Sequence, residues 1–68
     1  MKTISGAQFA KLLEKHGWKL LRVNGSHHIY GKPGYIERIS IPIHGSQLLK
    51  AGLLRHLLKV AGLSEDDL

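Results

Sequence analysis

The 68-residue chain contains no cysteine, which excludes disulfides and thiolate metal sites, and it carries a formal net charge of +5. A chain this short is expected to form one domain, residues 1–68, which buries only roughly 60% of its unfolded surface and offers shallow sites rather than a deep substrate cavity. Without the acidic last four residues, the chain has ten basic and two acidic side chains, a net charge of +8, which favours a polyanionic partner such as RNA or DNA over a basic surface with no ligand.

Residues 5–16 have the pattern of an amphipathic helix. Ser5 and Gln8 form a capping box of the S-x-x-Q type, and Gly17 supplies the left-handed residue at which such a helix commonly ends. Between these signals, the apolar residues that recur on one helix face are Phe9, Leu12 and Leu13.

Two strands joined by a tight turn follow this helix. Residues 18–23 and 27–32 are the strand candidates, and Asn24-Gly25 between them is the strongest two-residue signal for a β-hairpin. We therefore expect the two strands to pair antiparallel, with the turn at Asn24 and Gly25.

A third strand and a second helix complete the predicted fold. The sequence GKPG at residues 31–34 breaks the second strand, and residues 38–43 alternate polar and apolar side chains, with Pro42 favouring an edge or strand end. Residues 49–61 carry a broad leucine stripe that ends at Gly62. The order α-β-β-β-α predicts an α+β fold in which both helices pack on one face of a three-stranded antiparallel sheet.

Two adjacent histidines stand in the stretch VNGSHHIYG. Neighbours on a strand point to opposite faces, so His27 and His28 do not share a metal ion, and no HExxH or comparable metal-ligand spacing occurs. Ser26 beside His27 does not make a nucleophilic triad, since these side chains diverge and no orienting acid is apparent. Alternation places His27 with Ile29 and His28 with Tyr30, but it does not decide which pair faces the helices.

A single histidine is sufficient to cleave RNA, because RNA carries its own nucleophile. The 2′-hydroxyl attacks the adjacent phosphorus when a base removes its proton, and an imidazole with a pKa of about 6.5 suits that task at neutral pH. Nearby cations would stabilise the charge on the phosphoryl oxygens. Those expected near the hairpin are Lys19, Arg22, Lys32 and Arg38. The alternative is that one histidine packs beneath the sheet while the other is solvated.

The remaining histidines and aromatic residues favour structural roles. His44 in IPIHGS and His56 on the second helix are interpreted as structural. Trp18 and Tyr35 have side chains that stack on bases in RNA sites, although Trp18 suits closure of the small core better.

Three segments are distinctive when taken together. They are LLEKHGWKLLRVNGSHHIY at residues 12–30, IPIH at residues 41–44 and GLLRHLLKVAGLS at residues 52–64. With these segments the chain resembles HicA-family toxins, the small mRNA interferases of HicA–HicB toxin–antitoxin modules, over nearly its whole length. The resemblance implies a fold like that of double-stranded-RNA-binding domains, which agrees with the α-β-β-β-α order.

The resemblance also implies an activity and a site. A HicA-like chain is the toxin of a type II toxin–antitoxin module, cleaves mRNA without a metal or other cofactor, and is neutralised by a cognate HicB-like antitoxin that covers its site. The catalytic histidine of the family directly follows Gly-Ser, which maps to His27, with Gly25 and Ser26 of the motif intact. His28 is then the inward or supporting partner.

We therefore expect an endoribonuclease in which His27 serves as general base. The other hypothesis is a noncatalytic RNA- or DNA-binding module with a basic sheet face. No apolar run resembles a membrane span or a signal peptide, so we expect a cytoplasmic protein with no membrane partner.

Overall fold

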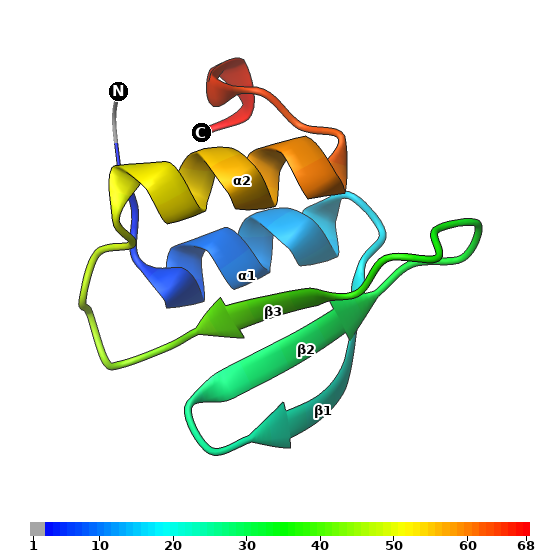
Figure 1. The fold of residues 1–68 in the computed structure, drawn as a ribbon, viewed down its shortest axis with the longest axis horizontal. Coiled ribbons are helices and arrows are strands. Elements are labelled where there is room, and N and C mark those ends of the chain that lie inside the picture. The colour runs from blue at the N-terminus through cyan, green and yellow to red at the C-terminus, as the bar shows by residue number, and fades with distance from the viewer. Residues whose placement is uncertain (1–2) are drawn as a thin grey trace.

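The helices and strands follow the predicted order. The computed structural model describes residues 3–68, so residues 1–2 of the predicted domain lie outside the described part. The elements are α1 (Gly6–Lys15), β1 (Lys19–Asn24), β2 (His27–Gly31), β3 (Ile39–Pro42), α2 (Ala51–Ala61) and a short 3-10 helix (Glu65–Asp67) (Figure 1). β2 pairs antiparallel with both β1 and β3, and the two helices lie together on one face of this sheet (Figure 1). The predicted α+β architecture is confirmed.

The capping signals at the helix ends act as the sequence predicts. The Ser5 hydroxyl accepts a hydrogen bond from the Gln8 backbone N–H at 3.1 Å, and the Gln8 side-chain oxygen accepts one from the Ser5 N–H at 2.9 Å. This reciprocal pair satisfies two backbone donors that the first turn of α1 leaves free. At the other end of the fold, Gly62 takes the left-handed conformation, with φ of 73°, and ends α2.

The second helix begins at Ala51, two residues later than predicted. Leu48 instead forms an isolated antiparallel bridge with Ser5, and the Leu49 N–H donates to the Ile4 carbonyl at 2.8 Å. These backbone bonds hold the segment extended, although Leu49 itself is buried. The approach to α2 is therefore tied to the segment that precedes α1.

The hairpin turn lies one residue later than predicted. Asn24 pairs with His27, so the two turn residues are Gly25 and Ser26 rather than Asn24 and Gly25. Gly25 has a φ of 64°, and within residues 3–68 every residue with a positive φ is a glycine. A type II′ turn needs a positive φ only at its first central residue, whereas a type I′ turn at Asn24-Gly25 would need one at both.

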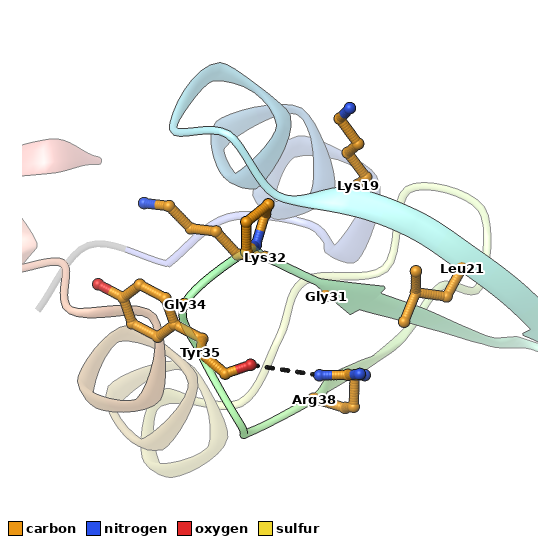
Figure 2. Close-up of a pocket in the computed structure, with 8 residues that line it drawn as sticks. Lys19, Leu21, Gly31, Lys32, Gly34, Tyr35 and Arg38 are labelled. Carbon is orange, nitrogen blue, oxygen red and sulfur yellow. Dashed lines mark hydrogen bonds between the residues drawn. The ribbon is translucent and has the colours of Figure 1, made fainter.

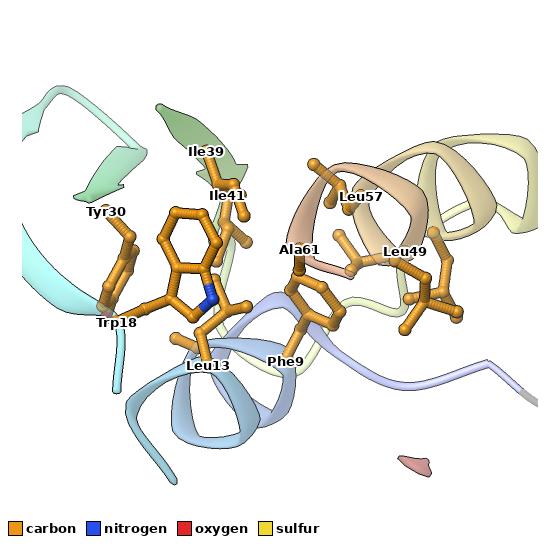
Figure 3. Packing of buried hydrophobic residues seen from close by; sticks show 12 residues of the cluster. Phe9, Leu13, Trp18, Tyr30, Ile39, Ile41, Leu49, Leu57 and Ala61 are labelled. Carbon is orange, nitrogen blue, oxygen red and sulfur yellow. The ribbon is translucent and has the colours of Figure 1, made fainter. Parts of the chain in front are cut away.

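One face of the sheet is covered by the helices and forms the core. Tyr30, Ile39 and Ile41 point into it, and burial, with a further contribution from the charge of Glu14, raises the pKa of the Tyr30 phenol. Trp18 is 1% exposed, which confirms that it closes the core. The buried cluster is Phe9, Ala10, Leu13, Trp18, Tyr30, Ile39, Ile41, Leu49, Leu54, Leu57, Leu58 and Ala61 (Figure 3).

β1 is an edge strand with all six of its residues exposed. The helices pack over β3 and leave β1 at the uncovered side of the sheet (Figure 1). A bulge between Leu20 and Arg22 shifts the register of β1 against β2, so the simple alternation expected for a strand fails at Leu21.

Candidate functional site

His27 projects from the face of the sheet that the helices leave open. His28 and Tyr30 lie opposite Ile41 and Ile39 of β3, which are buried beneath the helices. Side chains alternate along a strand, so His27 faces away from the helices. His27 is exposed and His28 is half-buried. The structure thus decides which histidine faces solvent, a point that periodicity alone left open.

A serine on the neighbouring strand holds the His27 ring. The Nδ1 atom of His27 lies 3.2 Å from the Oγ atom of Ser40, within hydrogen-bonding distance. Ser40 pairs with Ile29 in the ladder between β2 and β3, so it reaches His27 diagonally across the open face. With Nδ1 engaged, Nε2 is the ring nitrogen left to bind a ligand or exchange a proton. Sequence reasoning missed Ser40; its position between two buried isoleucines is the signal that places it on the open face.

The turn before β2 determines the position of His27. Gly25 supplies the positive φ, and a side chain at this position would meet no atom within 4 Å, so the requirement for glycine is conformational rather than steric. The Ser26 carbonyl accepts a hydrogen bond from the Ile43 N–H at 2.8 Å. This bond ties the turn to the segment that follows β3 and positions the start of β2.

The predicted phosphate-binding cations divide into two groups. Arg22 lies opposite Ile29, on the open face and in the strand beside His27. The other three line a hollow around Gly31, at the opposite end of β2 from His27, rather than lying near the hairpin: Lys19, Lys32 and Arg38 (Figure 2). The sequence predicted that Arg38 lies on the third strand, but in the structure Arg38 precedes β3.

A comparison with family models gives one match. The model described as "HicA toxin of bacterial toxin-antitoxin" matches residues 6–63, from the start of α1 to just beyond α2. The chain belongs to the HicA toxin family. It is therefore a toxin of the kind found in toxin–antitoxin systems, and the resemblance noted in its sequence is confirmed. No curated protein gives a significant match.

In this HicA-family chain, His44 and His56 are both exposed, on the loop after β3 and on α2. Within the part of the chain that the structure describes, no three His, Cys, Asp or Glu side chains gather as a metal-binding group. None of the helices in residues 3–68 is long and apolar enough to cross a membrane.

Proposed function

We propose that this HicA-family chain is a metal-independent endoribonuclease that cleaves mRNA, with His27 as general base. The observation that carries the proposal is the exposed His27 imidazole on the open sheet face, held at Nδ1 by Ser40. An imidazole exchanges a proton near neutral pH, and RNA supplies the nucleophile itself. The reaction needs no deep pocket, which agrees with a site on an open sheet.

The contact between Ser40 and His27 favours the role of His27 as a general base. When the Nδ1–H of His27 donates to the Ser40 hydroxyl oxygen, Nε2 is unprotonated and accepts the proton of a ribose 2′-hydroxyl. The 2′-oxygen then bonds to the adjacent phosphorus and the bond from phosphorus to the 5′-oxygen breaks. The 5′-oxygen takes up a proton from the imidazolium. The products carry a 2′,3′-cyclic phosphate and a 5′-hydroxyl.

A cation beside His27 would assist this step. Arg22 lies on the same open face, on the strand next to β2. Its guanidinium would stabilise the negative charge that builds on the phosphoryl oxygens, because arginine presents several donors in a fixed plane. His28, half-buried on the helix side, would support the start of β2 instead of touching RNA.

The family pairs such a toxin with an antitoxin. We infer that a HicB-like antitoxin neutralises this chain by covering the open face in the cytoplasm, where mRNA is found. The helices of the chain lie on the opposite face, so the cover for His27 has to come from another molecule (Figure 1).

The proposal is tested by incubating the purified protein with single-stranded RNA in excess EDTA. We expect cleavage to persist and the products to end in 2′,3′-cyclic phosphates, detected by mass spectrometry. An RNA with 2′-deoxyribose at the cleaved position should resist, because its nucleophile is missing. Salt-sensitive binding without any cleavage would instead establish a noncatalytic RNA-binding module, and loss of cleavage in EDTA would establish a metal requirement.

Ser40 provides a graded test of the histidine. Ser40→Ala removes the hydrogen bond to Nδ1, and a neutral hydrogen bond contributes about 0.5–1.5 kcal/mol, so we expect kcat to fall about 2- to 10-fold. The His27 ring should also populate both neutral tautomers in the variant, which 15N NMR detects, because the bond favours one tautomer. Ser40→Thr keeps the hydroxyl and should restore both properties. Equal activity of all three proteins over the whole pH range would contradict a positioning role for Ser40.

A further inference from the structure

A basic hollow lies on the open side of the sheet, at the end of β2 remote from His27. Its volume is about 410 Å³, and three of its lining side chains are cationic while none of the described residues that line it is acidic. The side chains that matter surround Gly31: Lys19, Leu21, Lys32, Tyr35 and Arg38 (Figure 2). They come from β1, from the loop after β2 and from the approach to β3.

Gly31 lies beneath the hollow and is buried, because the side chains of Leu21 and Arg38 pack over its backbone. A Cβ atom at this position would lie 2.8 Å from Leu21 Cδ1 and 3.2 Å from Arg38 Cδ. The side chains of Leu21 and Arg38 therefore approach each other over the glycine backbone. Leu21 is at the bulge of β1, and the bulge explains how its side chain reaches this face out of step with the strand alternation.

The loop that forms the other wall is fixed by contacts of its own. Arg38 Nη1 donates to the carbonyl oxygens of Tyr35 at 3.3 Å and Ile36 at 3.2 Å. The Tyr35 ring packs against buried Trp18, with centroids 5.1 Å apart, and Lys32 Nζ lies 5.1 Å from the Tyr35 centroid. The loop is thereby attached to the core, so the cations surround the hollow before any ligand binds.

The combination of groups defines the ligand. Lysine and arginine side chains around one hollow bind phosphate oxygens, and the exposed apolar side chain of Leu21 beside them suits contact with a ribose or base. The volume lies within the range of small-ligand sites. An acidic side chain of a protein would use the cations but leave the exposed apolar side chain of Leu21 without a partner.

We propose that this hollow binds a backbone phosphate of the RNA strand, with its nucleoside against Leu21, at a nucleotide remote from the scissile bond. The proposal rests on the RNA-cleaving function proposed above. Gly31 is four residues from His27, which corresponds to roughly 13 Å along a strand, so one nucleotide does not contact both sites. The hollow thus orients the RNA across the open face of the sheet and takes no part in bond cleavage.

Binding tests the hollow independently of cleavage. The variants are Lys19→Gln and Lys32→Gln, with Lys11→Gln on the exposed surface of α1 as the matched control. The probe is a fluorescein-labelled single-stranded RNA with 2′-O-methyl riboses, which lacks the nucleophile, titrated at several salt concentrations. We expect Lys19→Gln and Lys32→Gln each to raise Kd about 3- to 10-fold and to reduce the salt slope by about 0.7, with Lys11→Gln unchanged.

Cleavage of short and long RNA locates the hollow relative to the scissile bond. Lys32→Gln should raise the KM for a longer oligonucleotide much more than the KM for a dinucleotide, whereas Lys11→Gln should raise neither. Unchanged RNA binding by both hollow variants would overturn the proposal and leave an acidic protein as the ligand of these cations. If Lys32→Gln impaired cleavage of the dinucleotide as much as cleavage of the longer RNA, the proposal would also be overturned, because the hollow would then lie at the scissile bond. A wild-type protein that does not cleave RNA, but whose binding weakens in both hollow variants, would refute the proposed nuclease and support the binding site.

Discussion

Replacing His27 with alanine is expected to lower the rate of RNA cleavage by about 10²- to 10⁴-fold, the usual contribution of a general acid–base. The thermal unfolding curve should not change, because the His27 side chain is exposed and its hydrogen bond is to the exposed side chain of Ser40. The measurement is single-turnover cleavage of a defined RNA, with circular dichroism to verify folding. In cells, expression of the wild type should arrest growth and the variant should not.

His56→Ala is the matched control for this experiment. His56 is also an exposed histidine, but it lies on α2, which covers the other face of the sheet. Its replacement should leave cleavage and growth arrest as in wild type. Full activity of the His27 variant would refute the proposed base, whereas an equal loss in both variants would trace the effect to something other than the open face.

Leu54→Ala is expected to destabilise the fold by about 2–5 kcal/mol, the cost of removing a fully buried leucine. Leu54 lies on α2, is 0% exposed and belongs to the buried cluster beneath the sheet. A domain of this length has a total stability of roughly 3–10 kcal/mol, so the variant should be largely unfolded or melt far below the wild type. Urea denaturation followed by circular dichroism measures the difference.

The control for this experiment is Leu48→Ala. Leu48 is 58% exposed, so its truncation should change stability by less than about 1 kcal/mol. A small effect at Leu54 together with a large effect at Leu48 would contradict the packing described for α2.

The fold was predictable where the signals are local. Ser5 and Gln8 lie three residues apart and form their capping box within one turn, and Gly62 ends α2 through its own backbone. The alternation of polar and apolar residues at 38–43 agrees with the burial of Ile39 and Ile41 on one side of β3. In each case the decisive interaction joins residues that are close in the sequence, or follows directly from strand periodicity.

The predictions that were wrong concern features that depend on the pairing between strands. The Asn24-Gly25 signal predicted the right hairpin, but the register places the turn at Gly25-Ser26. The bulge that redirects Leu21 depends on how β1 pairs with β2, which no single strand reveals.

For the candidate site, the sequence named His27, which stays a prediction, and it did not reveal the residues around His27. The family resemblance selected His27, whereas the choice of face required knowledge of which residues lie under the helices. Ser40 reaches His27 only through the register between β2 and β3. Likewise, Lys19 precedes Lys32 by 13 residues, so its meeting with Lys32 and Arg38 at one hollow follows from the pairing of β1 with β2.

The exposed position of β1 has a consequence for solubility. An edge strand has backbone groups free to pair with a second chain, and Leu20, Leu21 and Val23 add apolar surface there. Two features that commonly block such pairing are both present: the bulge interrupts the ladder, and Lys19 and Arg22 place like charges along the edge. The cations proposed to bind RNA would therefore also repel a second copy of the chain, so the toxin would remain monomeric until a polyanion neutralises this edge.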